Sequence, residues 1–247
     1  MIDVKDISKS FGDQKVLKNI TTSFEKGKTN LIIGQSGSGK TVLMKCCIGL
    51  FGVDEGEIFF DDRCFSGLKE KDKKETRKEM GVLFQGGALF DSFTVEENIM
   101  FPLNMFTKQS FEEKLERVND VLSHVKLTNA NLKFPAELSG GMIKRVAIAR
   151  AIAMQPRYLF CDEPNSGLDP KTAEVIDELI SELTHKFDMT TVINTHDMNS
   201  VLQIGQKIAF INKGELWWEG DNIEILKTEN KELNDFVFST ELTRRIK

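Results

Sequence analysis

The sequence has little of what marks a membrane-spanning, secreted or zinc-binding protein. Its longest apolar stretches, such as 31–34 and 42–50, are far shorter than the roughly 20 residues that a transmembrane helix needs. Its first residues contain early acids and no apolar signal core. Its four cysteines form no CxxC pair, so no zinc site is expected. We therefore expect an uncleaved protein of the cytoplasm with reduced cysteines, of which Cys46, Cys47 and Cys161 lie in the core.

The sequence also has no excess of positively charged residues. The 247 residues include 33 Lys and Arg against 38 Asp and Glu, which gives a formal net charge of −5. This balance gives no electrostatic reason to expect nucleic acid or an anionic membrane as a partner. Hydrophobic residues make up 40% and charged residues 29% of the chain, a composition typical of neither a fibrous nor a disordered protein. The length suits one large domain or two small ones.

Strand and helix patterns alternate along the chain. The region 1–60 is rich in strands and turns, and the charged segment 69–77 is expected to be a solvated face or loop. This alternation favours an α/β fold with a mostly parallel sheet and helices on its faces. The predicted helices cover 41–50, 110–124, 143–154 and 170–185, and the predicted strands cover 29–33, 57–60, 81–85, 158–161, 190–194, 208–211 and 215–218.

A phosphate-binding loop stands between the strand at 29–33 and the helix that follows. Residues 34–41 match G-x-x-x-x-G-K-[ST] in full, and their glycines allow backbone N–H groups to turn toward phosphate oxygens. The start of the next helix also favours negative charge. Lys40 is placed to reach the β- and γ-phosphates, and the Thr41 hydroxyl to ligate Mg²⁺. The residues expected to bind the nucleotide here are Gly34, Gln35, Ser36, Gly37, Ser38, Gly39, Lys40, Thr41 and Val42.

Two adjacent acids, Asp162 and Glu163, end the apolar strand at 158–161. Two carboxylates at the end of a buried strand are poorly solvated unless a cation accompanies them, and Mg²⁺ with ATP would be that cation. Asp162 is therefore expected to hold the magnesium shell. Glu163, on the other side of the strand, is expected to polarise the attacking water.

A second glycine-containing helix start lies at Leu138-Ser139-Gly140-Gly141-Met142, before the helix predicted for 143–154. A hydroxyl and two flexible backbone N–H groups at the start of a helix favour an anion. The same residues also suit a simple N-cap by Ser139, although a cap does not require two glycines after it. The pattern by itself leaves both interpretations open.

With these motifs in this order, residues 1–220 resemble the ATP-binding cassette (ABC) ATPase family. Gly34–Thr41 matches its Walker A motif, Asp162 and Glu163 match Walker B with the catalytic glutamate, and 139–141 match its signature. Four further matches complete the resemblance: Phe11 at the adenine-stacking aromatic, Gln85 in the Q-loop, 166–169 in the D-loop, and His196 at the switch histidine. By composition alone, Phe11 would be one more core aromatic and His196 a structural histidine.

The resemblance implies a P-loop NTPase fold, with a RecA-like core, an antiparallel β subdomain and an inserted α-helical subdomain. The ABC ATPase domain would span 1–220, with the catalytic core and β subdomain at 1–90 and 156–220 and the helical subdomain at 91–155. Residues 221–247 would form a C-terminal helical extension. Their apolar positions, Ile225, Leu226, Leu233, Phe236, Val237 and Leu242, suit an amphipathic helix that covers the core, or else a contact with a partner cassette or a regulator.

The resemblance also implies a role for each matched residue. Glu163 would act as the base, His196 would hold the γ-phosphate, and Gln85 and Lys40 would assist hydrolysis. Two copies would dimerise head to tail, so that the signature of one chain closes the ATP site of the other. The implied catalytic residues are Glu163, His196, Gln85 and Lys40, the implied magnesium ligands are Thr41, Gln85 and Asp162, and the nucleotide contacts beyond 34–42 are Phe11, Ser139, Gly140, Gly141 and Asp169.

Within this family the chain is similar to the Mla-type (maintenance of lipid asymmetry) phospholipid transport ATPases. The similarity lies in Gln85–Ser92, in Val42-Leu43-Met44-Lys45, and in Met142, which replaces the usual Gln of the signature. It implies an ATPase that powers phospholipid transport at the cytoplasmic face of the inner membrane. Its partners would be a second copy, a permease gripped by 86–95, 98–99 and 101–103, and a periplasmic binding protein of the MCE type, with no nucleic acid. The alternatives are the ATPase of an amino-acid importer, a lipoprotein-release system or a non-transport ABC ATPase.

Overall fold

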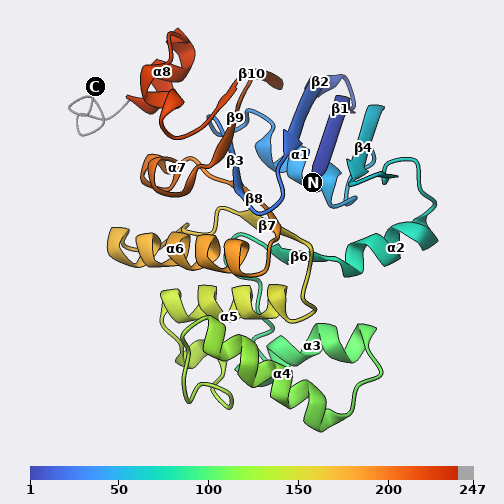
Figure 1. Ribbon diagram of the computed structural model, residues 1–247, viewed down its shortest axis with the longest axis vertical. Helices are drawn as coiled ribbons and strands as arrows, with labels where there is room; N and C mark the ends of the chain where they lie inside the picture. Colours follow the sequence, from blue (N-terminus) through green and yellow to red (C-terminus); the bar gives the residue numbers. More distant parts are fainter. Residues whose placement is uncertain (239–247) are drawn as a thin grey trace.

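The structure is a computed structural model that describes residues 1–238. Four N-terminal strands form an antiparallel sheet in the order β2-β1-β4-β5 (Figure 1). Ile2 pairs with Phe24 on one side and with Phe60 on the other, and all three side chains are buried because they face the same side of the sheet. The strands are β1 (Ile2–Phe11), β2 (Gln14–Phe24), β4 (Glu55–Phe60) and β5 (Arg63–Cys64).

A second sheet of six strands runs through the middle of the molecule in the order β10-β9-β3-β8-β7-β6. Its strands pair in parallel except for β10, which forms an antiparallel hairpin with β9. Every residue of β3 and β8 is buried, as expected for parallel strands covered on both faces. The strands are β3 (Thr29–Ile33), β6 (Met80–Leu83), β7 (Tyr158–Asp162), β8 (Thr190–Asn194), β9 (Lys207–Asn212) and β10 (Glu215–Gly220).

Two hydrophobic cores lie on opposite faces of this sheet. Ile32 belongs to the core shared with α1 (Lys40–Cys47) and the antiparallel sheet. Its neighbours Leu31 and Ile33 belong to the core shared with α5 (Gly140–Ile152) and α6 (Pro170–Lys186), because successive side chains of a strand point to opposite faces. The predicted α/β architecture is confirmed, and free Cys46, Cys47 and Cys161 are buried as predicted.

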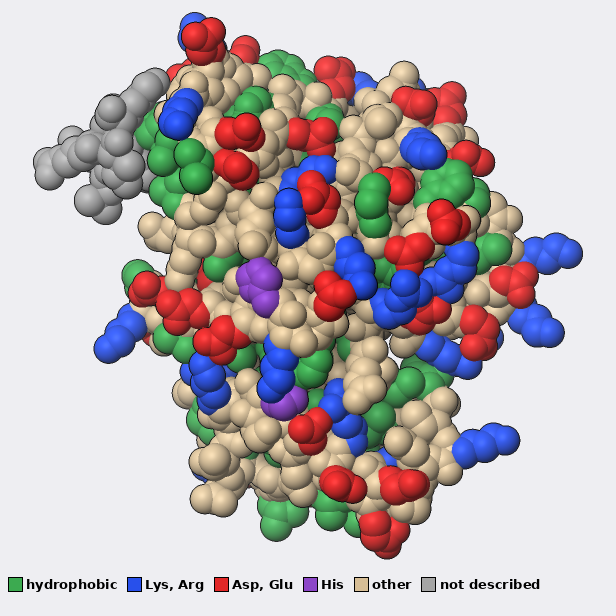
Figure 2. Space-filling model, viewed as in Figure 1, with side chains coloured by type: hydrophobic (Ala, Val, Ile, Leu, Met, Phe, Trp, Pro, Cys, Tyr) green, Lys and Arg blue, Asp and Glu red, His purple; other side chains and the backbone are tan. Residues whose placement is uncertain are grey.

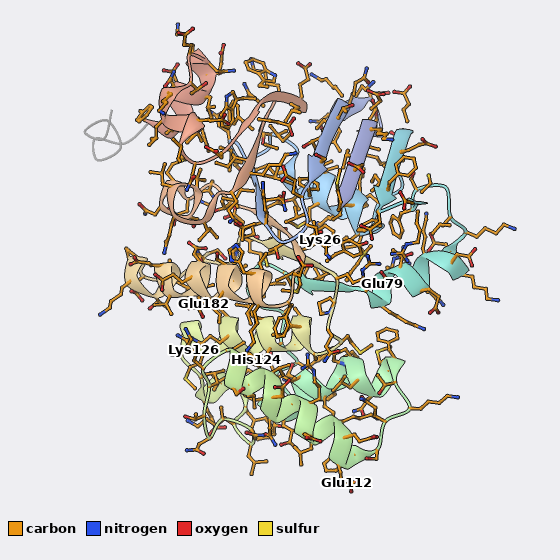
Figure 3. All side chains as sticks on the ribbon, in the orientation of Figure 1. Lys26, Glu79, Glu112, His124, Lys126 and Glu182 are labelled. Carbon is orange, nitrogen blue, oxygen red and sulfur yellow. The ribbon has the colours of Figure 1, made fainter. Side chains whose placement is uncertain are left out.

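A helical layer extends the second core away from the sheet. In Figure 1, α3 (Val95–Phe106) and α4 (Phe111–His124) lie beyond α5. Both begin with a capping box, formed by Thr94 with Glu97 and by Ser110 with Glu113. Past the end of α4, Lys126 forms an ion pair of 2.9 Å with Glu182 of α6 (Figure 3).

Two sequence-based expectations need correction. The helix after the signature begins at Gly140 rather than at residue 143, because Ser139 caps it there: its Oγ accepts a bond of 3.3 Å from the N–H of Met142. The charged segment predicted as a solvated face or loop is not a loop but a helix, α2 (Glu70–Lys78). The expectation of a solvated face is confirmed, since only Thr76 of this helix is buried. No helix among the described residues is long and apolar enough to cross a membrane, in agreement with the sequence.

The C-terminal segment covers the core with two short helices rather than one long one. The 3₁₀ helix η2 (Glu224–Lys227) and the helix α8 (Lys231–Val237) bury Ile225, Leu233 and Val237 against the second core, and Leu226 and Phe236 pack on it. A third short helix, α7 (Met198–Ile204), precedes β9. The predicted apolar contact Leu242 lies outside the described residues.

A charged cluster ties the two sheets together. The Arg63 guanidinium donates two bonds of 2.7 Å to the Glu79 carboxylate, which Figure 3 labels between α2 and β6. Asp61 accepts from the Tyr158 hydroxyl at 2.7 Å and from Arg157 at 2.5 Å. Burial by itself would raise the pKa of Asp61. Hydrogen bonds from the Met1 ammonium and Tyr158, together with the charge of Arg157, outweigh burial and lower the pKa to about 2.

Asp61→Asn should lower the free energy of unfolding at neutral pH by about 1–2 kcal/mol, after a discount for partial exposure of the pair. The folded pKa lies below the ordinary value of 3.8, so the stabilisation is complete above that value and is lost as pH falls toward about 2. Urea titrations from neutral to acidic pH should show the difference between the two chains shrinking. Exposed Asp62→Asn is the matched control and should change little. A difference independent of pH would contradict the assignment.

Candidate nucleotide site

A cavity of about 770 Å³ opens where β3, β7 and β8 end, at the carboxyl edge of the parallel strands, where open α/β sheets bind their ligands. Half of its lining residues come from the phosphate-binding loop, and Val42 follows them in α1. The others come from the segments that follow β6, β7 and β8, from β2 and from α8. The lining residues are Val16, Gln35, Ser36, Gly37, Gly39, Lys40, Thr41, Val42, Gln85, Glu163, His196 and Phe236.

The loop before α1 has a backbone that only glycine can adopt. Gly34 has a φ of 147°, and a Cβ there would lie 2.1 Å from the carbonyl oxygen of Ile211. Gly39, the residue before α1, has a φ of 109°, and a Cβ there would lie 2.9 Å from Leu17. Glycine at these positions lets the loop curl tightly over the start of α1, where free backbone N–H groups favour an anion.

Lys40 is held inside this loop. Its side chain is 7% exposed, and Nζ donates to the carbonyl oxygens of Gly34 at 2.7 Å and Gln35 at 3.0 Å. Burial lowers the pKa of Lys40, and the charges of Glu163 and Asp162 oppose that shift. The loop carbonyls hold the ammonium at the mouth of the cavity, where an incoming phosphate can replace them as its partner.

The residues beside Asp162 fit a magnesium ion bound through few protein ligands. The Thr41 hydroxyl donates to Asp162 Oδ1 at 3.3 Å, and Asn194 Nδ2 donates to the same oxygen at 3.1 Å. Asn194 is fully buried, and its own Oδ1 has no hydrogen-bond partner. Among the described residues no group of three or more His, Cys, Asp or Glu could hold a metal by itself. One carboxylate and one hydroxyl suit Mg²⁺, which takes its remaining ligands from phosphates and water.

Glu163 and His196 meet at the other side of the cavity. His196 Nδ1 lies 2.8 Å from Glu163 Oε1. Glu163 directly follows β7, and His196 lies two residues after the end of β8. Glu163 has a φ of 50°, an uncommon conformation for this residue type, and its N–H donates to the Asn194 carbonyl at 3.0 Å. A carboxylate beside an exposed imidazole, at the edge of a phosphate site, can accept a proton from water and contact a phosphoryl oxygen.

The four predicted nucleotide contacts at the starts of α5 and α6 lie outside this cavity, and Gly34 and Ser38 of the loop are also absent from its lining. Ser139 caps α5, and Gly140 and Gly141 form its first turn. Asp169 caps α6, where its Oδ1 accepts from the N–H of Thr172 at 3.0 Å. Gly141 has ordinary backbone angles but no space for a side chain, since a Cβ would lie 2.7 Å from Thr172. These residues therefore do not contribute to the cavity of their own chain.

Phe11 also lies outside the cavity lining. Its ring is 44% exposed and meets Phe51 edge-on at 5.1 Å. Two residues that the sequence motifs did not indicate line the cavity instead, Val16 of β2 and Phe236 of α8. No local sequence pattern indicates either residue, because both are distant from the motifs in the sequence and approach the cavity only in the folded chain.

A separate apolar groove of about 400 Å³ lies between β6, α3 and α5. Of the segments predicted to grip a permease, Ala88, Phe90, Phe101 and Pro102 line it, whereas Ile99 and Leu103 are buried in the core. The lining residues are Arg77, Lys78, Met80, Gly81, Val82, Phe84, Ala88, Phe90, Phe101, Pro102, Phe106, Arg150, Ala151 and Met154.

Two polar side chains, the half-buried Arg150 and the buried Asn98, shape the segment that borders this groove. Arg150 donates to the carbonyl oxygens of Gly87 and Ala88, each at 2.8 Å, and burial lowers its pKa. Asn98 accepts from the N–H of Phe90 at 2.9 Å and donates to three backbone carbonyls between 90 and 94. These bonds fix the path of the chain immediately after Gln85.

The ABC transporter family model matches residues 17–166. The methionine import ATP-binding protein MetN of Clostridium tetani is 37% identical over 244 residues, which are 98% of this chain and 76% of MetN. The probable ribonucleotide transport ATP-binding protein mkl of Mycobacterium leprae is 34% identical over 236 residues, or 96% of this chain and 68% of mkl.

Among solved structures, the dimer of MJ0796, a bacterial ABC transporter cassette, has a TM-score of 0.82 at 32% identity. The alignment covers 90% of this chain and 99% of the other. A post-hydrolysis state of the same cassette, with ADP and phosphate bound, has a TM-score of 0.81 at 31% identity over the same shares of the two chains. The chain therefore shares its fold with a cassette that is known as a dimer and with the products of hydrolysis bound.

Proposed function

The chain belongs to the ABC transporter family, and from this premise we propose that it powers phospholipid transport through a separate membrane permease. Its fold class is the predicted P-loop α/β fold of an ABC ATPase. Its reaction is the hydrolysis of ATP to ADP and phosphate, with Mg²⁺ as the metal. We infer that it docks on the cytoplasmic face of the inner membrane through the permease.

Each residue of the nucleotide site has a separate proposed role in ATP hydrolysis. Lys40, already directed into the phosphate-binding loop, holds the β- and γ-phosphates. Thr41 and Asp162, with Gln85 at the cavity wall, would hold Mg²⁺, which when bound polarises phosphoryl oxygens as a Lewis acid. Glu163 takes a proton from the attacking water, and His196 contacts the γ-phosphate.

A second copy of the chain completes the ATP site. Ser139, Gly140, Gly141 and Asp169 stand outside the cavity of their own chain, at the starts of α5 and α6. A helix start with unpaired N–H groups favours phosphate, so it suits the γ-phosphate bound by a facing Walker A loop. The dimeric state of MJ0796 supports this arrangement.

The apolar groove is the proposed docking site of the permease. Its exposed apolar lining is the observation that supports the transport proposal. Phe90 packs on Phe93 and Phe101 with ring centroids 5.1 and 4.8 Å apart, and it is 42% exposed. An exposed aromatic wall beside the Gln85 segment suits an apolar helix of the permease, and it links that helix to the nucleotide site through 86–88.

Arg150→Ala should weaken copurification with the permease by about tenfold, because 87–88 lose the bonds that shape the groove. The ATP affinity of the isolated chain should stay the same, since Arg150 lies outside the cavity. Arg117→Ala is the matched control. Arg117 likewise donates to two carbonyl oxygens, those of Ile152 and Ala153 at 2.9 Å, but it does not line the groove. Equal loss of permease in both variants would contradict the assignment.

Phospholipid is the proposed substrate because Gln85–Ser92, which carries the resemblance to Mla-type ATPases, includes two residues of the groove wall, Ala88 and Phe90. Met142 at the start of α5 supports the same branch. The second candidate is amino-acid import, which the 37% identity to MetN favours. A binding protein of the MCE type is the partner expected with phospholipid.

Isolation of the chain with its native membrane partners separates the two candidates. The copurifying proteins and bound small molecules are identified by mass spectrometry, and the ATPase rate of the complex in nanodiscs is measured with added phospholipid or methionine. Phospholipid in the complex and a rate that responds to it alone would support the proposal. A complex that lacks lipid and responds to methionine would replace it with the importer.

A further inference from the structure

A buried carboxylate from α6 holds the loop that carries Glu163. Asn165, two residues after Glu163, donates from Nδ2 to Asp177 Oδ2 at 2.7 Å and to the Ser200 hydroxyl at 3.0 Å. Asp177 is 2% exposed and Ser200 is 1% exposed. One amide group therefore joins α6, the loop after β7, and α7, which follows His196.

Burial of the Asp177 carboxylate lowers the stability of the fold, which indicates that this residue has a role other than stabilisation. Among the residues that the structure describes, no cation forms an ion pair with it, and its Oδ1 has no hydrogen-bond partner. Burial raises the pKa of Asp177 to about 6. Hydrogen bonds from Ser200 and Asn165 oppose that rise, and the nearby negative charge of Asp197 adds to it. A buried carboxylate without a cation is worse for stability than an apolar side chain of similar size.

The contacts of Asp177 connect it to the segments that carry two proposed catalytic groups, Glu163 and His196. Asn165 belongs to the same turn as Glu163, and Ser200 lies four residues after His196. On the opposite side of this loop, the buried Lys144 of α5 reaches the hydroxyl of Ser166 at 3.4 Å. The loop is thus held by α5, α6 and α7 together, and its position sets the contact of 2.8 Å between Glu163 and His196.

We propose that Asp177 is a positioning residue for ATP hydrolysis, which clamps Asn165 against Ser200 and so fixes Glu163 relative to His196 and the γ-phosphate. The proposal rests on the catalytic roles proposed above for Glu163 and His196. Asp177 does not line the nucleotide cavity, so its effect is on the rate of the chemical step and not on ATP binding. A displacement of about 1 Å at a reacting group can cost up to 100-fold in rate.

Asp177→Val, assayed in the full-length chain, should lower kcat by about 10- to 100-fold while the KM for ATP and the affinity for a fluorescent ATP analogue stay within about twofold. The thermal midpoint should not fall, because the substitution removes a buried charge. Asp177→Asn should retain most of kcat, since its amide oxygen can still accept from Asn165. Adding Asn165→Ala to Asp177→Val should cause no further loss, because both changes break the same link.

Thr184→Val is the matched control. Thr184 is a fully buried polar residue of the same helix, and its hydroxyl bonds to Ile180 and Thr191, away from the loop. It should lower the thermal midpoint and leave kcat unchanged. Normal kcat in Asp177→Val, or an equal loss of kcat in Thr184→Val, would overturn the proposal. If Asp177→Val does not fold, Asn165→Ala and Ser200→Ala give the same test. Glu163→Gln, measured in parallel, distinguishes failure of the positioning role of Asp177 from failure of the catalytic role of Glu163. Normal turnover in Glu163→Gln would refute the catalytic role itself.

Discussion

Glu163→Gln should bind ATP as tightly as the parent chain and hydrolyse it at least about 100-fold more slowly. Glutamine keeps the size of the side chain and the oxygen that contacts His196, which lies 2.8 Å away. It cannot accept a proton from water at neutral pH, so the general-base step is lost while the geometry stays. With hydrolysis blocked, ATP should keep two chains together, and a closed dimer should accumulate.

Phosphate release measures the rate, and sedimentation with and without Mg²⁺ and ATP measures the dimer. Glu182→Gln is the matched control, because Glu182 lies on the exposed side of α6 and pairs with Lys126 far from the cavity (Figure 3). That change should leave both readouts as they are in the parent chain. Parental turnover in Glu163→Gln, or no ATP-dependent dimer, would show that another group activates the water.

Much of the fold follows from local patterns in the sequence. The short runs at 29–33 and 190–194 are central strands that are buried along their whole length, and the helix of 111–124 has its apolar positions at helical spacing. The boundaries are harder to predict, because they depend on caps. Ser139 starts α5 three residues early by accepting the Met142 N–H, and the charged segment after Lys69 becomes a helix whose solvent-exposed face carries most of its side chains.

The phosphate loop could be predicted because its chemistry lies in eight consecutive residues, and the structure places six of them in the cavity wall. Asn194 and Asp177 could not. Asn194 acts on Asp162 across neighbouring strands, and Asp177 acts on Asn165 from the next helix, so neither forms a pattern along the chain. Phe236 reaches the cavity only because α8 folds back over β9, where it lies 5.6 Å from the ring of Phe210.

Surface charge gives less information than these buried groups. On the face seen in Figure 2, the side chains of Lys and Arg are interspersed with those of Asp and Glu, and no broad area has a single sign. Mixed charge of this kind gives little long-range attraction for a polyanion. Recognition by this chain is therefore expected to depend on the cavity and the groove, where individual side chains are fixed by hydrogen bonds.

A mixture of two inactive variants should regain ATPase activity if each site is built from both chains. Lys40→Ala removes the buried ammonium of the Walker A loop. Ser139→Arg places a large side chain at the start of α5, where the partner's nucleotide is proposed to bind. Each variant by itself should keep at most a few per cent of the parental rate. In an equal mixture about half of the dimers pair the two variants, and each of those has one intact site, so about a quarter of the parental rate should return.

The informative control is a mixture of Lys40→Ala with Glu163→Gln. Both residues line the same cavity of the same chain, so every mixed dimer has a defect in each of its two sites and the rate should stay low. Recovery in the first mixture and not in the second would assign Ser139 to the partner's site and Glu163 to its own. If neither mixture recovered although mixed dimers form, the head-to-tail arrangement would be refuted, since Ser139 would then belong with Lys40.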